Sequence, residues 1–308
     1  MKILTVCSVN SGKIAPFVIE QAATLKEKGC EMDFFTVEGK GIRGYLRNRE
    51  KLNRKINEFH PDIIHAHYGL SGLLANLQRK IPVITTYHGS DINDRKILRL
   101  SKIVIFLSRF NIFVSQKNID IAKPKKNYAL IPCGVNIDIF KPLNRNECRN
   151  KLGFGEEEKL ILFSSSFDNR VKNPALAKEA VELLKNTRLI ELKGYGRQQV
   201  CELMNAVDAV LMTSFTEGSP QFVKEAMACN CPIVSTDAGD VKKLIFDVEG
   251  CFICPFSAKE IAEALQTVFF LNKKTAGRNK ILNLDNQQIA EKIMNIYRNV
   301  VPDRHSVG

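Results

Sequence analysis

The sequence predicts an α/β protein built from two open parallel sheets that are covered by helices. Its 308 residues exceed the length at which one hydrophobic core usually keeps growing, so two domains are expected. Short β-branched runs alternate with amphipathic stretches along almost the whole chain, a pattern typical of parallel sheets. The segment Lys141–Asn144 interrupts this alternation. We therefore predict one domain over residues 1–143 and a second over residues 144–308.

Strands and helices are predicted to alternate through the first half of the chain. The helix Phe17–Lys28 is the clearest, because its apolar residues form one stripe and Gly29 follows as a stop. The predicted strands are Ile3–Val6, Met32–Thr36, Ile63–His65, Val83–Thr86, Ile103–Leu107, Ile112–Val114 and Ala129–Ile131.

The second half repeats the alternation. Its predicted strands are Leu160–Phe163, Leu189–Leu192, Ala209–Met212, Ile233–Ser235 and Phe252–Ile253. Its predicted helices are Pro174–Leu184, Gln199–Ala206, Pro220–Cys229, Ala258–Leu271 and Gln287–Asn299. Such sheets bind ligands beyond the carboxyl ends of their strands, so two facing domains are expected to hold the active site in the cleft between them.

The composition is that of a folded protein inside the cell. Hydrophobic residues make up 44% of the chain, and the N-terminus shows no basic leader followed by an apolar core. The apolar runs have strand length rather than the ~18 residues of a membrane span. Nine cysteines in such a chain are expected to be reduced, with the pairs Cys229/Cys231 and Cys251/Cys254 buried rather than bound to a metal. A cytoplasmic location is expected.

The positive charge is concentrated in the first half of the chain. Residues 1–150 contain 25 Lys and Arg against 13 Asp and Glu, whereas residues 151–308 contain 20 of each kind, so the first half carries the whole excess of +12. A basic half suits nucleic acid, an anionic membrane surface or an acidic substrate, and a merely solvated surface is the alternative. Nucleic acid is not expected, because no basic strand with interleaved aromatics and no zinc module accompanies the charge.

Two carboxylates are predicted to meet at the start of one helix. Ser219 as the N-cap and Pro220 at the first helical position form a strong helix start. Glu217 precedes this helix, and Glu225 lies inside it with a side chain that tilts back toward the helix start. Helix amides attract anionic ligands and carboxylates accept hydroxyl hydrogen bonds, so this spot suits a sugar joined to phosphate. A lone pair of glutamates at this spacing is more often surface charge.

The context of these glutamates resembles the retaining glycosyltransferases of family 4, which have two facing Rossmann-like domains (the GT-B fold). The stretch Glu217–Ser235 matches the family pattern E-G-x-P-x-x-x-x-E-A-M-A-x-x-x-P-V-V. Ile131–Pro142 is similar to the segment between its two domains, and Pro61–His67 with Pro82–Gly89 is similar to its N-terminal pattern. The resemblance spans nearly the whole chain, and its motifs occur in the family's order.

The resemblance implies a donor site in the second domain. Glu217 would face the transferred sugar as a catalytic residue, and Glu225 would hold the ribose hydroxyls. Donor contacts are also implied for Gly218 and for the amides of Ser219, Gln221 and Phe222.

Cations are implied beside the leaving diphosphate. Lys172 matches the family's phosphate-binding lysine, whereas the arginine that the family places before it falls at Ser166 here. Arg170 is expected to replace that arginine from another place in the loop, with a solvated cation as the alternative.

Further contacts are implied in the first domain. His88 ends a predicted strand and would contact the donor sugar as a third catalytic group, through its side chain or its backbone carbonyl. Gly12 would approach the donor phosphate, while Lys13 and His67 would contact the acceptor. His65 and His67 flank a strand end, where we expect a polar turn or an acceptor pocket rather than a metal site.

The resemblance implies a metal-independent hexosyltransferase that needs no cofactor. It would move a sugar from a nucleotide-diphosphate sugar, with retained configuration, to a hydroxyl of a polysaccharide or lipid-linked glycan of the cell envelope. The basic first half adds an anionic membrane surface as an expected partner, with peripheral attachment at the inner face of the cytoplasmic membrane. The alternative is a non-catalytic nucleotide-sugar-binding or regulatory protein of the same fold.

Overall fold

The computed structural model describes residues 1–10 and 12–301, which form two compact units. One unit is Met1–Gly134 together with the helix that begins at Asn286, and the other is Val135–Asp285. The expected division at residues 143 and 144 differs from these units at both ends. Residues 135–143 belong to the second unit, and the last helix belongs to the first.

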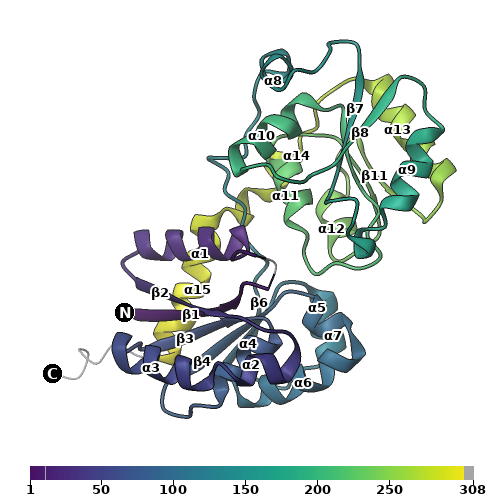
Figure 1. Cartoon of the computed structure of the whole chain (residues 1–308). Helices are drawn as coiled ribbons and strands as arrows, with labels where there is room; N and C mark the ends of the chain where they lie inside the picture. The colour runs from purple at the N-terminus through teal and green to yellow at the C-terminus, as the bar shows by residue number, and fades with distance from the viewer. Residues whose placement is uncertain (11, 302–308) are drawn as a thin grey trace. The chain divides into compact units, whose positions relative to one another are not determined.

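The first unit contains a six-stranded parallel sheet in the order β2-β1-β3-β4-β5-β6 (Figure 1). Its strands are β1 (Lys2–Ser8), β2 (Glu31–Val37), β3 (Ile63–His67), β4 (Val83–Tyr87), β5 (Phe110–Phe113) and β6 (Tyr128–Leu130). Its helices are α1 (Pro16–Glu27), α2 (Gly41–Leu46), α3 (Arg49–Phe59), α4 (Gly69–Asn76), α5 (Ser90–Asn93), α6 (Arg95–Leu107), α7 (Gln116–Ala122) and α15 (Asn286–Val300).

Helix α15 joins the first unit through one apolar face. Ile289, Ile293 and Met294 are buried along it, and the helix packs against α1. The Tyr297 hydroxyl lies 2.6 Å from Nδ1 of His65, inside the same unit. The 3.6-residue periodicity of the sequence predicts this helix, but it does not predict which of the two units the helix packs against.

The predicted strand Ile103–Leu107 is wrong, because these residues form the last turns of α6. The Asp94 carboxylate caps the start of this helix by accepting hydrogen bonds from the amides of Lys96 and Ile97. Ser101 and Val104 are buried at helical spacing, while Phe106 is exposed. A short apolar run is compatible with a strand or with a helix, and here the buried residues follow the spacing of a helix.

The second unit contains a five-stranded parallel sheet in the order β11-β10-β9-β7-β8. Its strands are β7 (Lys159–Phe163), β8 (Thr187–Ile190), β9 (Ala209–Met212), β10 (Ile233–Thr236) and β11 (Cys251–Cys254). Its helices are α8 (Arg145–Leu152), η1 (Arg170–Lys172), α9 (Pro174–Glu182), α10 (Arg197–Ala206), α11 (Gln221–Ala228), α12 (Val241–Ile245), α13 (Ala258–Leu271), α14 (Gly277–Ile281) and η2 (Leu282–Leu284). Two parallel α/β sheets confirm the predicted fold class.

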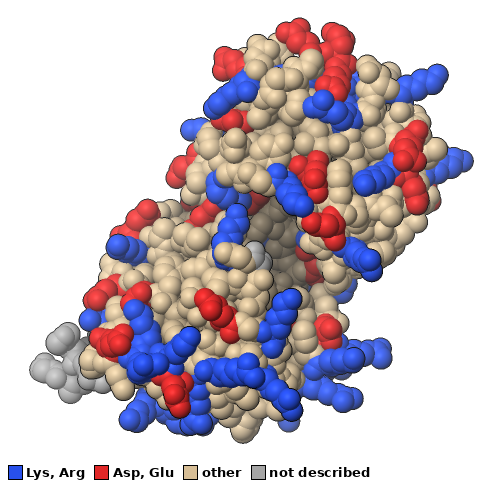
Figure 2. Space-filling model, viewed as in Figure 1, with Lys and Arg blue, Asp and Glu red and all other residues tan. Residues whose placement is uncertain are grey.

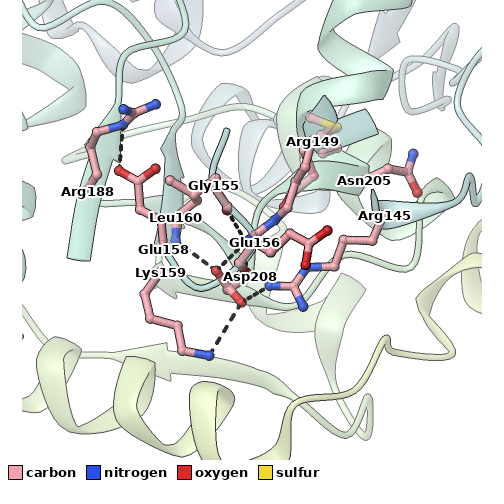
Figure 3. A network of polar contacts seen from close by, with 12 residues as sticks. Arg145, Arg149, Gly155, Glu156, Glu158, Lys159, Leu160, Arg188, Asn205 and Asp208 are labelled. Carbon is pink, nitrogen blue, oxygen red and sulfur yellow. Dashed lines mark hydrogen bonds and ion pairs between the residues drawn. The ribbon is translucent and has the colours of Figure 1, made fainter. Parts of the chain in front are cut away.

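A buried cluster of charged side chains lies at the amino-terminal ends of strands β7 and β9 (Figure 3). The Arg149 side chain is 1% exposed and donates to the carbonyls of Gly155, Glu156 and Ala206. Arg149 also contacts the Asp208 carboxylate at 3.0 Å, and Asp208 accepts a second hydrogen bond from the amide of Leu160. The cluster therefore joins α8 to the end of α10 and the start of β7.

Across the described residues, no helix combines the length and the apolar character needed to cross a membrane.

Candidate functional site

The loops at the carboxyl ends of β7 and β9 bring two predicted site residues into contact. Nζ of Lys172 lies 2.5 Å from Oε1 of Glu217, and the two side chains are only 24% and 12% exposed. An ion pair shielded from water in this way is electrostatically stronger than one on an open surface. The sequence predicted both residues at the donor site, and the structure joins them directly.

Hydrogen bonds hold the lysine loop in place. The Thr213 hydroxyl, just after β9, donates to the carbonyls of Lys172 and Asn173 at 2.9 and 2.8 Å. The amide of Phe215 donates to the carbonyl of Val171 at 3.0 Å. The ammonium group of Lys172 therefore projects from a backbone that the neighbouring strand supports, which is what a preorganised cation requires.

The predicted capping role of Ser219 is wrong. Pro220 caps α11 with an extended backbone, and the helix begins at Gln221 without a side-chain cap. The buried Ser219 hydroxyl instead donates to Oδ2 of Asp240 at 2.6 Å. Burial raises the pKa of Asp240, and the hydrogen bond from Ser219 and the charge of Lys224 act against that rise. The Ser219 hydroxyl therefore bonds Asp240, which is distant in the sequence, and does not cap the amides of the helix that follows it.

Gly239 lets two loops of the site approach each other. Its φ of +67° lies in the left-handed region, and a Cβ there would meet the Gly218 carbonyl oxygen at 2.6 Å. The same Cβ would lie 3.0 Å from Cβ of Glu217. Only glycine fits this position without moving the Glu217 loop.

The variant Gly239→Ala is expected to weaken binding of a nucleoside diphosphate in titration calorimetry by about tenfold or more, because the clash displaces Gly218. Gly153→Ala is the matched control. Gly153 has a φ of +72° with nothing within 4 Å of the added Cβ, so it carries the backbone strain without the clash. Equal loss of binding in both variants would show that backbone strain alone is responsible.

The sequence predicts a turn at Gly194–Arg197 beside the nucleobase but assigns Arg197 no contact, and the structure shows that this residue contacts the predicted site residue Glu225. Arg197 begins α10, and Nη1 lies 2.7 Å from Oε1 of Glu225, whose side chain is 5% exposed. The Arg197 guanidinium also stacks over the Phe140 ring at 4.5 Å. The glycine-containing turn Gly194–Gly196 directly before it was the available signal. Arg170, in contrast, is exposed at the start of η1 beside Lys172.

The remaining predicted donor contacts lie in the first turn of α11. Phe222 is 8% exposed, and the Gln221 side-chain oxygen accepts a hydrogen bond from Lys224 at 3.4 Å. Gln221 and Phe222 lie at the start of this helix, and helix starts commonly bind oxygen-rich ligands.

In the first unit, the structure brings together His67 and His88. Nδ1 of His67 lies 3.0 Å from Nε2 of His88, and the Cys133 sulfur lies 3.5 Å from Nδ1 of His88. The rings of Phe17 and Tyr68 pack against His88 at 4.8 and 4.6 Å. Burial, reinforced by the charges of the neighbouring histidines, lowers the pKa of His67 well below its usual value. His67 is therefore a neutral hydrogen-bonding group that holds the His88 ring.

The polar turn expected at His65 and His67 is wrong, because both residues are buried within β3. Their rings stack 4.6 Å apart, since residues two positions apart on a strand share a face. Nδ1 of His65 pairs with the Tyr297 hydroxyl and Nε2 with the Thr86 hydroxyl. Burial lowers the pKa of His65 to about 3, so it too is neutral.

Asp91 supports the backbone at His88. Its carboxylate is buried and accepts hydrogen bonds from the amides of His88, Gly89 and Gly69 at 3.0 to 3.1 Å. Burial raises the pKa of Asp91 to about 6, and those amides act in the opposite direction. The turns after β3 and β4 are thereby tied to one side chain.

Gly12 and Lys13 follow β1. Gly12 adopts a φ of +91°, and its amide donates to the carbonyl of Val9 at 2.8 Å. Lys13 is exposed. The contacts therefore join Lys172 with Glu217 in the second unit and His67 with His88 in the first.

Two family models match most of the chain. Residues 15–139 match the model described as Glycosyltransferase Family 4, and residues 169–269 match the model described as Glycosyl transferases group 1.

Curated relatives carry similar names. A putative teichuronic acid biosynthesis glycosyltransferase, TuaC, of Bacillus subtilis is 26% identical over 68% of this chain and 62% of its own length. A D-inositol 3-phosphate glycosyltransferase of Mycobacterium marinum is 24% identical over 71% of this chain and 58% of its own length. The chain thus spans about three fifths of the length of these relatives.

Solved structures share the fold. Sucrose-phosphate synthase from Thermosynechococcus elongatus superposes with a TM-score of 0.82 at 18% identity, covering 97% of this chain and 99% of that one. Anabaena Alr3699/HepE in complex with UDP-glucose superposes with a TM-score of 0.72 at 18% identity, covering 97% of this chain and 98% of that one.

Proposed function

Because the chain belongs to the GT-B-fold glycosyltransferases of the family 4 and group 1 type, we propose that it moves a sugar from a nucleotide-diphosphate donor to an acceptor hydroxyl. The contact between Lys172 and Glu217 is the observation that carries this proposal. It sets a cation and a carboxylate side by side at the carboxyl edge of a parallel sheet, where such sheets bind ligands. The cation suits phosphate and the carboxylate suits sugar hydroxyls.

The leaving diphosphate gains negative charge as the glycosidic bond breaks. Lys172 and the first amides of α11 would stabilise that charge, with Arg170 as a further cation in the same loop. Glu217 would orient the sugar, and we keep His88 as a proposed further contact of the sugar. We propose a retaining reaction in which the acceptor hydroxyl attacks from the side that the diphosphate leaves. The phosphate then takes the proton, so no side-chain base and no metal is required.

The nucleotide would lie toward Glu225 and Arg197. A carboxylate accepts two ribose hydroxyls well, and Arg197 holds Glu225 in place from the start of α10. The complex of the Anabaena protein with UDP-glucose supports a uridine nucleotide as the first donor to test.

The acceptor we propose is a polysaccharide or lipid-linked glycan of the cell envelope, with Lys13 on its side and the buried His67 orienting the His88 ring. The name of the Bacillus relative, which refers to teichuronic acid biosynthesis, supports this class. The basic first half of the chain supports peripheral attachment to the inner face of the cytoplasmic membrane.

Hydrolysis of nucleotide sugars in the absence of acceptor tests the function. UDP-glucose, UDP-N-acetylglucosamine, GDP-mannose and ADP-glucose are compared, and one donor is expected to release sugar with retained anomeric configuration. Glu217→Ala is expected to abolish this release, while Glu249→Ala, at an exposed surface ion pair, is expected to retain it. Equal rates of sugar release in Glu217→Ala and the unmodified protein would exclude the proposed enzymatic reaction and favour a nucleotide-sugar-binding protein.

Replacement of Glu225 by glutamine is expected to weaken binding of the matching nucleoside diphosphate about tenfold, because charge-assisted hydrogen bonds to the ribose become neutral ones. Thermal shift at a range of nucleotide concentrations measures this. The unmodified protein should gain roughly 2.7 kcal/mol at a hundredfold excess over Kd. If Glu225→Gln gained the same stabilisation free energy at the same nucleotide concentration, the proposed contact between Glu225 and the ribose would be excluded.

A further inference from the structure

The exposed side of helix α6 combines apolar and basic side chains. Phe106 is 86% exposed and Ile103 is 51% exposed, whereas Ser101 and Val104 of the same helix are buried. Arg99 and Lys102, one turn before them, are exposed on the same side. A single exposed apolar residue needs no explanation, but a large aromatic ring beside several cations on one helix is typical of segments that lie on membranes.

The charge around this helix has one sign. Residues 95–109 contain no Asp or Glu. Their cations are all exposed and are Arg95, Lys96, Arg99, Lys102 and Arg109. Cations gathered without acidic neighbours on a folded surface produce a positive potential that attracts an anionic surface.

Helix α2 extends this surface. Ile42 and Leu46 are 40% and 39% exposed, with Arg43 and Arg47 beside them. Both α2 and α6 pack against α4, so they belong to one helix layer on the sheet (Figure 1). Lys and Arg side chains gather over the lower part of this unit, where these helices lie (Figure 2). Here the outer sides of α2 and α6 are called the basic-apolar face.

The basic-apolar face holds a large part of the excess positive charge of the first half. Arg47 leads into α3, and residues 39–54 contain six cations against one acid, Glu50. The second unit offers an instructive contrast, because Phe270 on α13 is 88% exposed but shares its helix with Glu260 and Glu263. An exposed aromatic ring is therefore present in both units, and Phe106 differs from Phe270 in that its helix carries cations and no acidic residue.

We propose that the basic-apolar face docks on an anionic lipid bilayer, with Phe106 and Ile103 entering the headgroup region and the flanking cations contacting lipid phosphates. A lipid-linked glycan, one of the two acceptor classes proposed above, would then be presented to an enzyme already held at the membrane. Charge complementarity selects an anionic surface, and exposed apolar side chains between the cations are typical of helices that lie on a bilayer.

Flotation with vesicles tests the proposal on the full chain. The unmodified protein is expected to float with vesicles of equal parts phosphatidylcholine and phosphatidylglycerol, to lose binding as salt rises, and to stay behind with pure phosphatidylcholine. Phe106→Ser is expected to lower the partition coefficient about tenfold. Arg99→Gln with Lys102→Gln is expected to lower it about fivefold for each cation.

Matched variants in the second unit serve as controls. Phe270→Ser removes an equally exposed ring, and Lys185→Gln with Lys259→Gln removes two exposed cations. Binding should stay unchanged in both. Equal losses in test and control variants, binding without regard to lipid charge, or tighter binding to a DNA duplex than to vesicles would each overturn the proposal.

The docking proposal rests on the proposed function only for its purpose, which is to bring the enzyme to a membrane-bound acceptor. Donor hydrolysis in vesicle-free buffer reports that function separately, and Phe106→Ser should leave it unchanged. Normal hydrolysis without vesicle binding would overturn the docking face alone, whereas vesicle binding without hydrolysis would overturn the proposed reaction alone.

Discussion

Replacement of Lys172 by methionine is expected to lower the turnover of donor by about 10²- to 10³-fold, as the loss of one preorganised group at a developing negative charge does in other enzymes. Methionine keeps the length of the side chain and removes its charge. The charge on the diphosphate develops in the transition state, so kcat should fall far more than the donor KM rises. Steady-state hydrolysis and transfer kinetics measure the two effects.

Two further variants isolate the role of the Lys172 charge. Lys172→Arg retains a cation and is expected to recover part of the turnover, which shows that the site still folds. Lys193→Met is the matched control, because Lys193 pairs with Asp168 at 3.0 Å on an exposed part of the same unit. The role assigned to Lys172 fails if Lys193→Met loses as much activity or if Lys172→Met loses none.

Glu217 should act together with Lys172 rather than independently. The two side chains are in contact, so the losses in Lys172→Met and Glu217→Gln are expected to be non-additive in the double variant. Additive losses would mean that the ion pair breaks before the reaction and that each residue acts alone.

The variant Asp208→Asn is expected to destabilise the second unit by about 3 to 5 kcal/mol, because it leaves the buried Arg149 guanidinium without its counter-charge. For a unit of this size the corresponding fall in Tm is on the order of 10 °C. The surrounding carbonyls cannot supply a negative charge (Figure 3). Differential scanning calorimetry measures the change.

Asp168→Asn provides the control for this stability effect. Its partner Lys193 is 59% exposed, and water replaces the lost contact, so Tm should hardly move. The double variant Arg149→Met with Asp208→Asn should lose less stability than the two single variants together, because it leaves neither charge buried without its partner. A fall in Tm for Asp168→Asn as large as for Asp208→Asn would contradict the special role of the buried pair.

Local patterns predicted much of this molecule. The alternation of short apolar runs and amphipathic stretches follows from the periodicities of strands and helices, so the strands of both sheets and most helices were predictable. The helix predicted over Pro220–Cys229 differs from α11 by one residue at each end. The family resemblance placed both Lys172 and Glu217 at the donor site, but it did not predict the ion pair that joins them.

Other features depended on residues far apart in the chain. The Ser219 hydroxyl bonds Asp240, the Arg197 guanidinium bonds Glu225, and neither partner is visible to a local rule. The run Ile103–Leu107 is equally apolar as a strand or as a helix, and the packing of α6 against α4 through Ser101 and Val104 decided between them.

The sequence by itself determined the fold class and the Glu217 to Glu225 stretch, since both depend on spacing along the chain. The tertiary structure alone decided that α15 joins the first unit, where Tyr297 meets His65 from 232 positions away. It also decided that the His67 ring holds His88. Hydrogen bonds and burial act between neighbours in space, and only folding establishes which residues those neighbours are.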